Sequence, residues 1–125
     1  MLNTKTFEFL SKQHIRHASE FDTVFKRGKR VASGCFVLCY LMMEHDYPRL
    51  GMVISKRNCA LAVNRNRIKR IIREQFRLKQ HALPGIDLVV FQKSSSKKIS
   101  DQEQGECIEK LFSQLIVHCS GSSSN

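Results

Sequence analysis

The chain has 125 residues, 42% of them hydrophobic, and a formal net charge of +10. Its length and composition predict one folded domain with its own core and exclude a disordered chain. The charge is uneven, because residues 1–99 hold twenty Lys and Arg against seven carboxylates, whereas residues 100–125 hold four carboxylates and one lysine. Such an excess destabilises a compact domain by self-repulsion, so we expect a counter-charged partner.

Five cysteines, at positions 35, 39, 59, 107 and 119, form no Cys-x-x-Cys pair and no framework spacing. We interpret them as reduced, buried thiols of a cytoplasmic protein. A zinc site made of Cys35, Cys39 and His45 is formally possible but matches no familiar structural pattern. The longest apolar run, Cys35 to Met43, is at most half a bilayer span, and the first residues lack the apolar core of a signal peptide. We therefore expect no membrane partner and no export.

The first third of the chain predicts a short helix followed by a strand. Residues 1–13 are expected to be a loose, basic lead-in. Ser19 is the expected N-cap of the helix and Gly28 its stop, with acidic residues in the first turn and basic residues in the last. Residues 31–43 are β-branched, aromatic and nearly all apolar, which predicts a strand with both faces covered.

The middle of the chain predicts two further strands and a long helix. Residues 44–48 have the composition of a turn, and residues 49–55 are expected to form an antiparallel hairpin with the preceding strand. A long basic helix is predicted over residues 60–82, ended by Pro84-Gly85. A third strand is predicted over residues 86–92.

A last helix begins near Ser100, because Ser100-Asp101-Gln102-Glu103 has the form of a capping box. Residues 120–125 are expected to be a disordered tail. The predicted fold is an α/β sandwich of one small sheet and three helices, in a single domain spanning residues 1–119.

The long helix carries the clearest functional signal. Seven basic residues lie between positions 65 and 79, interrupted by a single carboxylate, Glu74. At about 100° per residue the isoleucines and Phe76 share one arc. The opposite arc is polar: Asn66, Lys69, Arg70, Arg73 and Arg77. Exposed helix faces normally mix charges of both signs, and guanidinium groups bind phosphate bidentately. This row therefore predicts nucleic acid as the partner.

Phe21 and Phe25 allow two interpretations. They can pack in the core of the short helix, or they can form an aromatic platform for unpaired bases. Four cations that follow them favour a nearby phosphate backbone: Lys26, Arg27, Lys29 and Arg30. The carboxylates before position 100 are scattered, and the histidines show no paired spacing with them, so neither set predicts a nuclease active site. We expect the chain to bind nucleic acid but not to cut it unaided.

The run Arg65-Asn66-Arg67-Ile68-Lys69-Arg70, with Ser55-Lys56-Arg57-Asn58 and Phe21-Asp22-Thr23-Val24-Phe25, resembles the bacterial ribonuclease P protein family. The resemblance covers roughly residues 14–118. It implies an accessory subunit, inactive alone, that joins a large catalytic RNA and helps remove the 5′ leader from precursor tRNA. The RNA would supply the active site and its magnesium ions, with no cofactor on the protein itself.

The family fold implied is an α+β two-layer sandwich with a small mixed sheet, three helices and a left-handed β-α-β crossover, like ribosomal protein S5 domain 2. Such a crossover departs from the right-handed norm. The resemblance also implies a set that contacts the catalytic RNA: Lys56, Arg57, Asn58, Arg65, Asn66, Arg67, Lys69 and Arg70. A second set would bind the leader: Phe21, Phe25, Val37, Cys39, Lys69 and Arg73. His14 stands where the family commonly has arginine, and Cys39 stands where some members have a leader-stacking tyrosine.

Two rival functions share the basic helix. A DNA-binding zipper protein would continue into apolar heptads, but Pro84-Gly85 stops this helix, so DNA is not an expected partner. A ribosomal-type structural RNA-binding protein would share the electrostatics without the leader cleft, and it stays open as the alternative.

Overall fold

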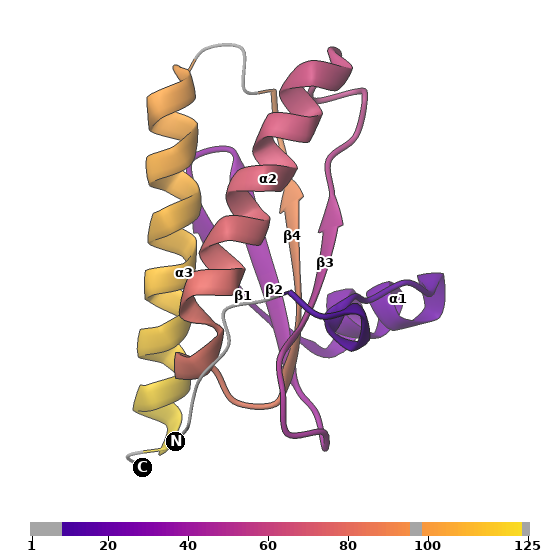
Figure 1. Ribbon diagram of the computed structural model, residues 1–125, viewed down its shortest axis with the longest axis vertical. Helices are drawn as coiled ribbons and strands as arrows, with labels where there is room; N and C mark the ends of the chain where they lie inside the picture. The colour runs from indigo at the N-terminus through magenta and orange to yellow at the C-terminus, as the bar shows by residue number, and fades with distance from the viewer. Residues whose placement is uncertain (1–8, 96–98, 124–125) are drawn as a thin grey trace.

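The computed structural model describes residues 9–95 and 99–123, without the side chains of residues 121–123. Its centre is a mixed four-stranded sheet in the order β1-β2-β4-β3 (Figure 1). The strands are β1 (Lys29–Ser33), β2 (Phe36–Met42), β3 (Arg49–Val53) and β4 (Ile86–Gln92). Helices α2 (Ala62–Lys79) and α3 (Asp101–Ser123) cover one face, and α1 (Ala18–Arg27) packs on the other. The predicted sandwich of a small mixed sheet and three helices is confirmed.

The single strand predicted over residues 31–43 is wrong, because the chain turns back on itself at Gly34. This glycine has φ +60°, a left-handed conformation that favours glycine. The turn joins β1 and β2 in an antiparallel hairpin, with Val31 opposite Leu38. Five of the seven residues of β2 are buried, which explains the unbroken apolar run in the sequence.

The hairpin predicted between the strand at 31–43 and that at 49–55 is also wrong. β3 pairs in parallel with β4, with Leu50 opposite Leu88, and β2 pairs antiparallel with β4, with Leu38 opposite Val90. Six of the seven residues of β4 are buried. This strand therefore buries more apolar surface between two neighbouring strands than it would at an edge of the sheet. The connection β3–α2–β4 is the expected left-handed crossover, since α2 lies in front of the sheet in Figure 1 with β4 to the left of β3.

Two hydrophobic cores lie on opposite faces of the sheet, because side chains along each strand alternate between them. The larger core joins the sheet to α2 and α3, with Leu38, Ile72 and Phe112 all fully buried. The smaller core joins the sheet to α1 and contains Ile15, Val24, Val37, Cys39 and Val89. Since α1 is short, it covers only part of its face.

One predicted cap is confirmed and one is wrong. The Ser100 hydroxyl accepts a hydrogen bond from the Glu103 N–H at 3.1 Å, and the Glu103 carboxylate accepts one from the Ser100 N–H at 3.1 Å, as in a capping box. Helix α1 begins two residues earlier than expected, with His17 as its N-cap in place of Ser19. The Glu20 carboxylate accepts the His17 N–H at 3.4 Å, so this carboxylate takes over the expected capping role.

The chain ends are more ordered than predicted. Residues 1–8 of the expected loose lead-in lie outside the described residues, but Phe9 stacks on His14 with ring centroids 3.8 Å apart. Helix α3 continues to Ser123, so the tail predicted to be disordered is helical in part, and residues 124–125 lie outside the described residues. The helix predicted over 60–82 is confirmed as α2 followed by a 3₁₀ turn, Gln80–Ala82.

Candidate nucleic-acid interface

The polar face of α2 is confirmed as a row of cations turned away from the core. Ile68, Ile72 and Phe76 are 0% exposed, which anchors one face of the helix. On the other face, Arg70 is exposed and Lys69 and Arg73 are half-buried. Within the described part of the chain, no carboxylate forms an ion pair with these three cations. They are therefore available to an external polyanion.

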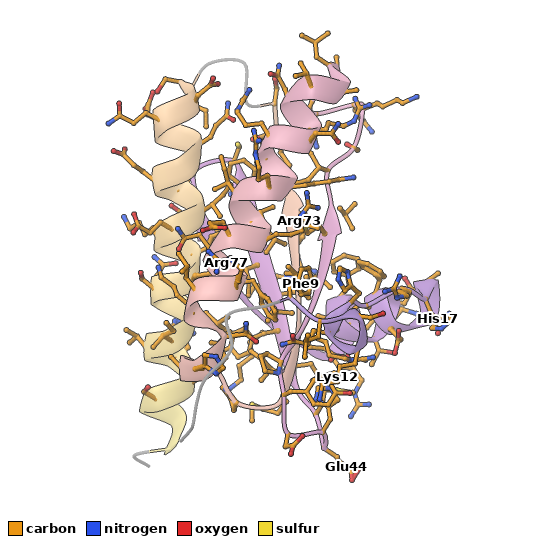
Figure 2. All side chains as sticks on the ribbon, in the orientation of Figure 1. Phe9, Lys12, His17, Glu44, Arg73 and Arg77 are labelled. Atoms are coloured by element: carbon orange, nitrogen blue, oxygen red, sulfur yellow. The ribbon has the colours of Figure 1, made fainter. Side chains whose placement is uncertain are left out.

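The predicted row of five polar residues is one cation shorter than expected. Arg77 donates from Nη2 to the Glu74 carboxylate at 2.6 Å and from Nε at 3.3 Å (Figure 2 shows its place on α2). This hydrogen bond lowers the pKa of Glu74 and raises that of Arg77. The single carboxylate of the basic segment thus neutralises the last arginine of the row and leaves those before it unpaired.

Arg65 and Asn58, both expected to contact RNA, hold the loop before α2 in place. Arg65 Nη1 donates to the carbonyls of Cys59 and Ala60 at 2.9 and 2.8 Å. The Asn58 side-chain amide donates to the Gln92 carbonyl at 2.9 Å, and the Gln92 amide donates back to the Asn58 carbonyl at 3.1 Å. The Asn58 bonds tie the loop to the end of β4, and the Arg65 bonds hold the loop against the first turn of α2. The Asn58 amide and Arg65 Nη1 are thus both bonded within the protein.

Arg67 also belongs to the residues predicted to contact RNA, and it links α2 to α3. Its Nη2 lies 2.9 Å from an Asp101 carboxylate oxygen and donates to Gln104 Oε1 at 2.9 Å. Asp101 is 72% exposed, so this ion pair is solvated and weak. The arginines on either side of Asn66 therefore shape the entry of α2. Asn66 is exposed on the helix, and Lys56 and Arg57 are exposed in the segment before it.

The predicted leader residues Phe21, Phe25, Val37 and Cys39 all lie on the α1 face of the sheet. Phe21 and Phe25 are half-buried, so each packs on the smaller core and still presents part of its ring. Val37 is 7% exposed and Cys39 0% exposed. The Cys39 side chain is enclosed in the core and lies beneath the groove, so it can support the groove only from below.

An open groove runs across this face beside α1. Phe25 and Val53 line both of two adjoining depressions, with Phe21 in the first and Phe91 in the second. Phe91 meets Phe25 edge to face, with ring centroids 5.5 Å apart. Val53 is 41% exposed, which leaves apolar surface on the floor. This surface suits the faces of unpaired bases.

The groove is also lined by two arginines that are absent from the predicted site residues. Arg16 lines the depression beside Phe21, and Arg30 lies over the Phe91 ring at 5.8 Å from its centroid. Val53 and Phe91 were missed as well, because they come from β3 and β4, whose pairing was not predicted. The signal that existed for Arg30 was its place in the basic run after Phe25.

His14 connects the α2 cations to this groove. It pairs with Leu50 at the outer edge of β3, and its ring stacks on Phe9, which contacts Phe76 of α2 at a centroid distance of 5.0 Å. Burial and the nearby charges of Arg16 and Arg73 hold the pKa of His14 below its ordinary value. In Figure 2, Arg73 lies on α2 close to Phe9. The cationic row therefore reaches the β3 edge from which the groove begins.

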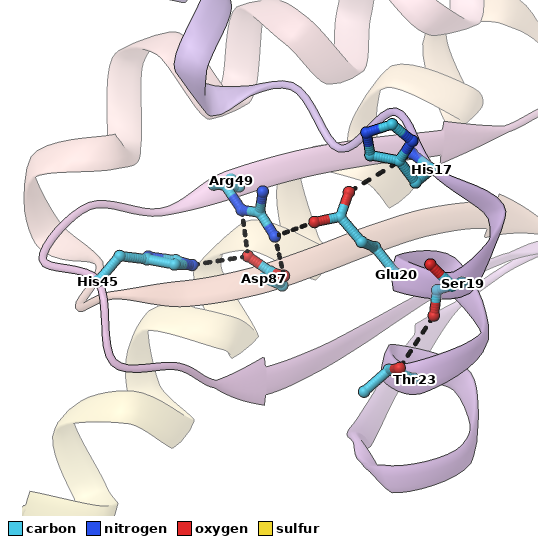
Figure 3. Close-up of polar contacts among 7 residues, drawn as sticks. All are labelled: His17, Ser19, Glu20, Thr23, His45, Arg49 and Asp87. Atoms are coloured by element: carbon cyan, nitrogen blue, oxygen red, sulfur yellow. Dashed lines mark hydrogen bonds and ion pairs between the residues drawn. The ribbon is translucent and has the colours of Figure 1, made fainter.

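A charged cluster fixes α1 on the sheet. In Figure 3 the Arg49 guanidinium lies between two carboxylates, with Asp87 at 2.6 and 2.8 Å and Glu20 of α1 at 2.9 Å. His45 Nε2 contacts the same Asp87 at 3.0 Å. Asp87 is only 2% exposed, and its hydrogen bond is the main cause of a raised Arg49 pKa. This cluster sets the position of the helix that carries Phe21 and Phe25, two of the three phenylalanines that line the groove.

Two further properties bear on the chemistry of the interface. No group of three or more His, Cys, Asp or Glu side chains in the described residues is arranged to hold a metal ion. Cys35 and Cys39 lie in different cores, which separates two of the three zinc ligands considered from the sequence. Among the described helices, none is both long and apolar enough to cross a membrane.

Comparison with known proteins identifies the family. The model of the family Ribonuclease P matches residues 9–116. The ribonuclease P protein component of Nitrosococcus oceani is 37% identical over 118 residues, covering 94% of this chain and 99% of its relative. That of Coxiella burnetii is 41% identical over 110 residues, covering 88% and 91%.

Solved structures agree with the sequence comparisons. The ribonuclease P protein of Staphylococcus aureus superposes with a TM-score of 0.73 at 29% identity, covering 82% of this chain and 94% of the other. That of Thermotoga maritima gives a TM-score of 0.67 at 32% identity, covering 82% and 94%. The matches in sequence and fold extend across nearly the whole chain and lead to one assignment: this chain belongs to the ribonuclease P protein family.

Proposed function

We propose that this protein is the accessory subunit of a bacterial ribonuclease P and binds two RNA elements at once. The exposed face of α2, with Lys56 and Arg57, contacts the catalytic RNA. The groove lined by Phe21, Phe25 and Phe91 holds the single-stranded 5′ leader of precursor tRNA. The RNA carries the chemistry and its magnesium ions, and the protein increases affinity for substrate and metal by screening phosphate charge.

Two features carry this proposal: the unpaired cationic row of α2, and an apolar groove on the opposite face of the sheet, which the row approaches around the β3 edge. Lys69, Arg70 and Arg73 have no ion-pair partner among the described residues, so their repulsion is relieved only by an external anion. Arg73 lies where the row meets the β3 edge. One RNA strand can thus run from phosphate contacts on α2 to base contacts on the phenylalanines.

The groove favours this function over that of a ribosomal-type structural RNA-binding protein. Such a protein needs the charge but has no use for half-buried aromatic rings at the edge of an open depression. The rings of Phe25 and Phe91 meet at 5.5 Å, and Arg30 lies over the Phe91 ring, a combination that fits an unpaired strand better than a duplex.

The deciding experiment is processing of precursor tRNA by the ribonuclease P RNA of the same organism at low magnesium, with and without the protein. We expect the protein to restore cleavage at the mature 5′ end and to be inactive without RNA. Equal cleavage rates with and without the protein would contradict the proposal. Turnover by a preparation shown to be free of RNA would contradict the division of labour.

A further inference from the structure

The tip of α2 carries two apolar side chains that the cationic interface does not explain. Leu61, the N-cap residue, is 62% exposed, and Val63, in the first turn, is 69% exposed. Isolated apolar side chains are ordinary on a protein surface. These two, however, lie two residues apart at the end of the helix that carries the densest positive charge of the chain.

Val63 belongs to the same stripe as the cations. Residues three and four apart lie next to each other on a helix, so Val63 continues the line formed by Asn66, Arg70 and Arg73. Leu61 lines the same depression as Arg57, which precedes the helix, and as the ion pair between Arg67 and Asp101. We call the two exposed side chains, Leu61 and Val63, the apolar tip of α2. Arg57 precedes it along the chain, and Asn66 and Arg70 follow Val63 along the helix.

The chemistry of this tip selects its partner. Phosphates cannot cover apolar surface, and a regular duplex presents them on its outside while its base faces stay stacked within. A protein partner of like composition, including a second copy of this chain, would bring one set of cations against another. Unstacked bases offer apolar faces next to phosphates, so they match both the tip and its border.

We infer that Leu61 and Val63 pack against unpaired, unstacked bases of the catalytic RNA, while the bordering cations bind the flanking phosphates. This inference rests on the proposed function and adds to it that α2 enters a non-helical junction or loop of the RNA. Affinity at the tip then has an apolar part, which is independent of salt, and a phosphate part, which falls with salt.

The salt dependence of binding separates these two parts. The Leu61→Ser/Val63→Ser double variant is compared with wild type for affinity toward the ribonuclease P RNA of the same organism over a series of salt concentrations. We expect a loss of about 10- to 100-fold at every salt concentration, with an unchanged slope of log affinity against log salt. Arg70→Ala should instead reduce the magnitude of that slope, by up to about 0.9.

The control is Val117→Ser, which changes an apolar side chain of similar exposure, 66%, on α3. It should bind RNA as wild type does, and thermal unfolding should show all variants folded. The inference is overturned if the double variant loses no more affinity than this control, or if its slope falls as that of Arg70→Ala does. Self-association of the wild type that the double variant abolishes would also overturn it, by identifying a second copy as the occupant.

A footprint on the RNA gives a second readout. Chemical probing of unpaired adenines and cytosines should show a small group of bases protected by wild type and Val117→Ser but not by the double variant. Identical footprints for all three proteins would contradict base packing. If the wild-type protein does not bind this RNA, both the proposed function and this inference fail. If wild type binds and the double variant binds equally well, only this inference fails.

Discussion

The Arg49 cluster should be the most sensitive polar site of the fold. Replacing Arg49 by methionine keeps the aliphatic stem but leaves Asp87, 2% exposed, as a buried carboxylate without its main partner. Loss of one member of a buried ion pair costs about 3–5 kcal/mol. His45 still contacts Asp87, and Glu20 is 29% exposed, so we expect the lower end of this range, about 3 kcal/mol.

The assay is urea unfolding at neutral pH, followed by circular dichroism. An exposed arginine of α1 provides the control, because Arg27 forms no ion pair with any residue that the structure describes, and Arg27→Met should change stability by less than about 0.5 kcal/mol. Adding Asp87→Leu to Arg49→Met should recover part of the loss, since it removes the buried charge. An Arg49→Met protein as stable as Arg27→Met, or no recovery in the double variant, would refute the reasoning.

The same variant tests how α1 supports the groove. Glu20 is the α1 member of the cluster, and Phe21 follows it directly, so loss of Arg49 should loosen the helix at its first turn. At a temperature where Arg49→Met remains folded, we expect the preference for precursor over mature tRNA to fall. Affinity for the catalytic RNA should stay near that of wild type, because the α2 face is on the other side of the sheet.

Three further outcomes are expected. Arg73→Ala should weaken binding of precursor tRNA about tenfold and of mature tRNA much less, since a charge-assisted contact to the leader is lost; equal losses in a binding titration of the two would remove the leader role. Glu74→Gln removes the single carboxylate beside the row and with it the ion pair to Arg77. Affinity for the catalytic RNA should therefore rise about threefold at moderate salt, and an unchanged or lower affinity would count against the row as the RNA contact. Burial raises the pKa of Glu20, but the hydrogen bond and charge of Arg49 outweigh it, so the pKa in the folded protein is lower than the ordinary carboxyl value. The Glu20–Arg49 pair therefore stabilises the fold above the ordinary carboxyl pKa. This stabilisation is lost as the pH falls through the lower pKa of the folded state. Acid unfolding curves of wild type and Arg49→Met should therefore converge below that value and diverge above it.

Helices were predictable from the sequence because their signals are local. The apolar spacing of Ile68, Ile72 and Phe76 predicted which face of α2 is buried, and the capping box at Ser100 predicted where α3 begins. Pairing between strands was not predictable in the same way. Nothing within residues 49–55 indicates whether their partner is the strand before them or β4 after α2, since that choice depends on which strand gains most by occupying the centre of the sheet.

The errors in the candidate site follow from the same cause. Val53 and Phe91 reach the groove only because β3 and β4 are neighbours, so their role was invisible without the pairing. Arg67 and Asn58 lie in a motif that indicates RNA binding, but their side chains bond to residues far along the chain. A charge pattern thus identifies the candidate helix for RNA binding, whereas only tertiary contacts reveal which of its side chains remain available.

Gly51 offers a direct test of how closely the groove depends on the sheet beneath it. A Cβ at this position would lie 2.6 Å from Cε1 of Phe21, so Gly51→Ala must displace that ring. We expect a loss of about 1–3 kcal/mol in stability, as in other overpacked cores, together with weaker leader binding. Gly105→Ala is the matched control, because a Cβ there has no neighbour within 4 Å and alanine favours the interior of α3, so stability should rise by up to about 1 kcal/mol. If Gly51→Ala keeps both its stability and its preference for precursor tRNA, the Phe21 ring moves freely, and the groove is not held in shape by the strand on which it rests.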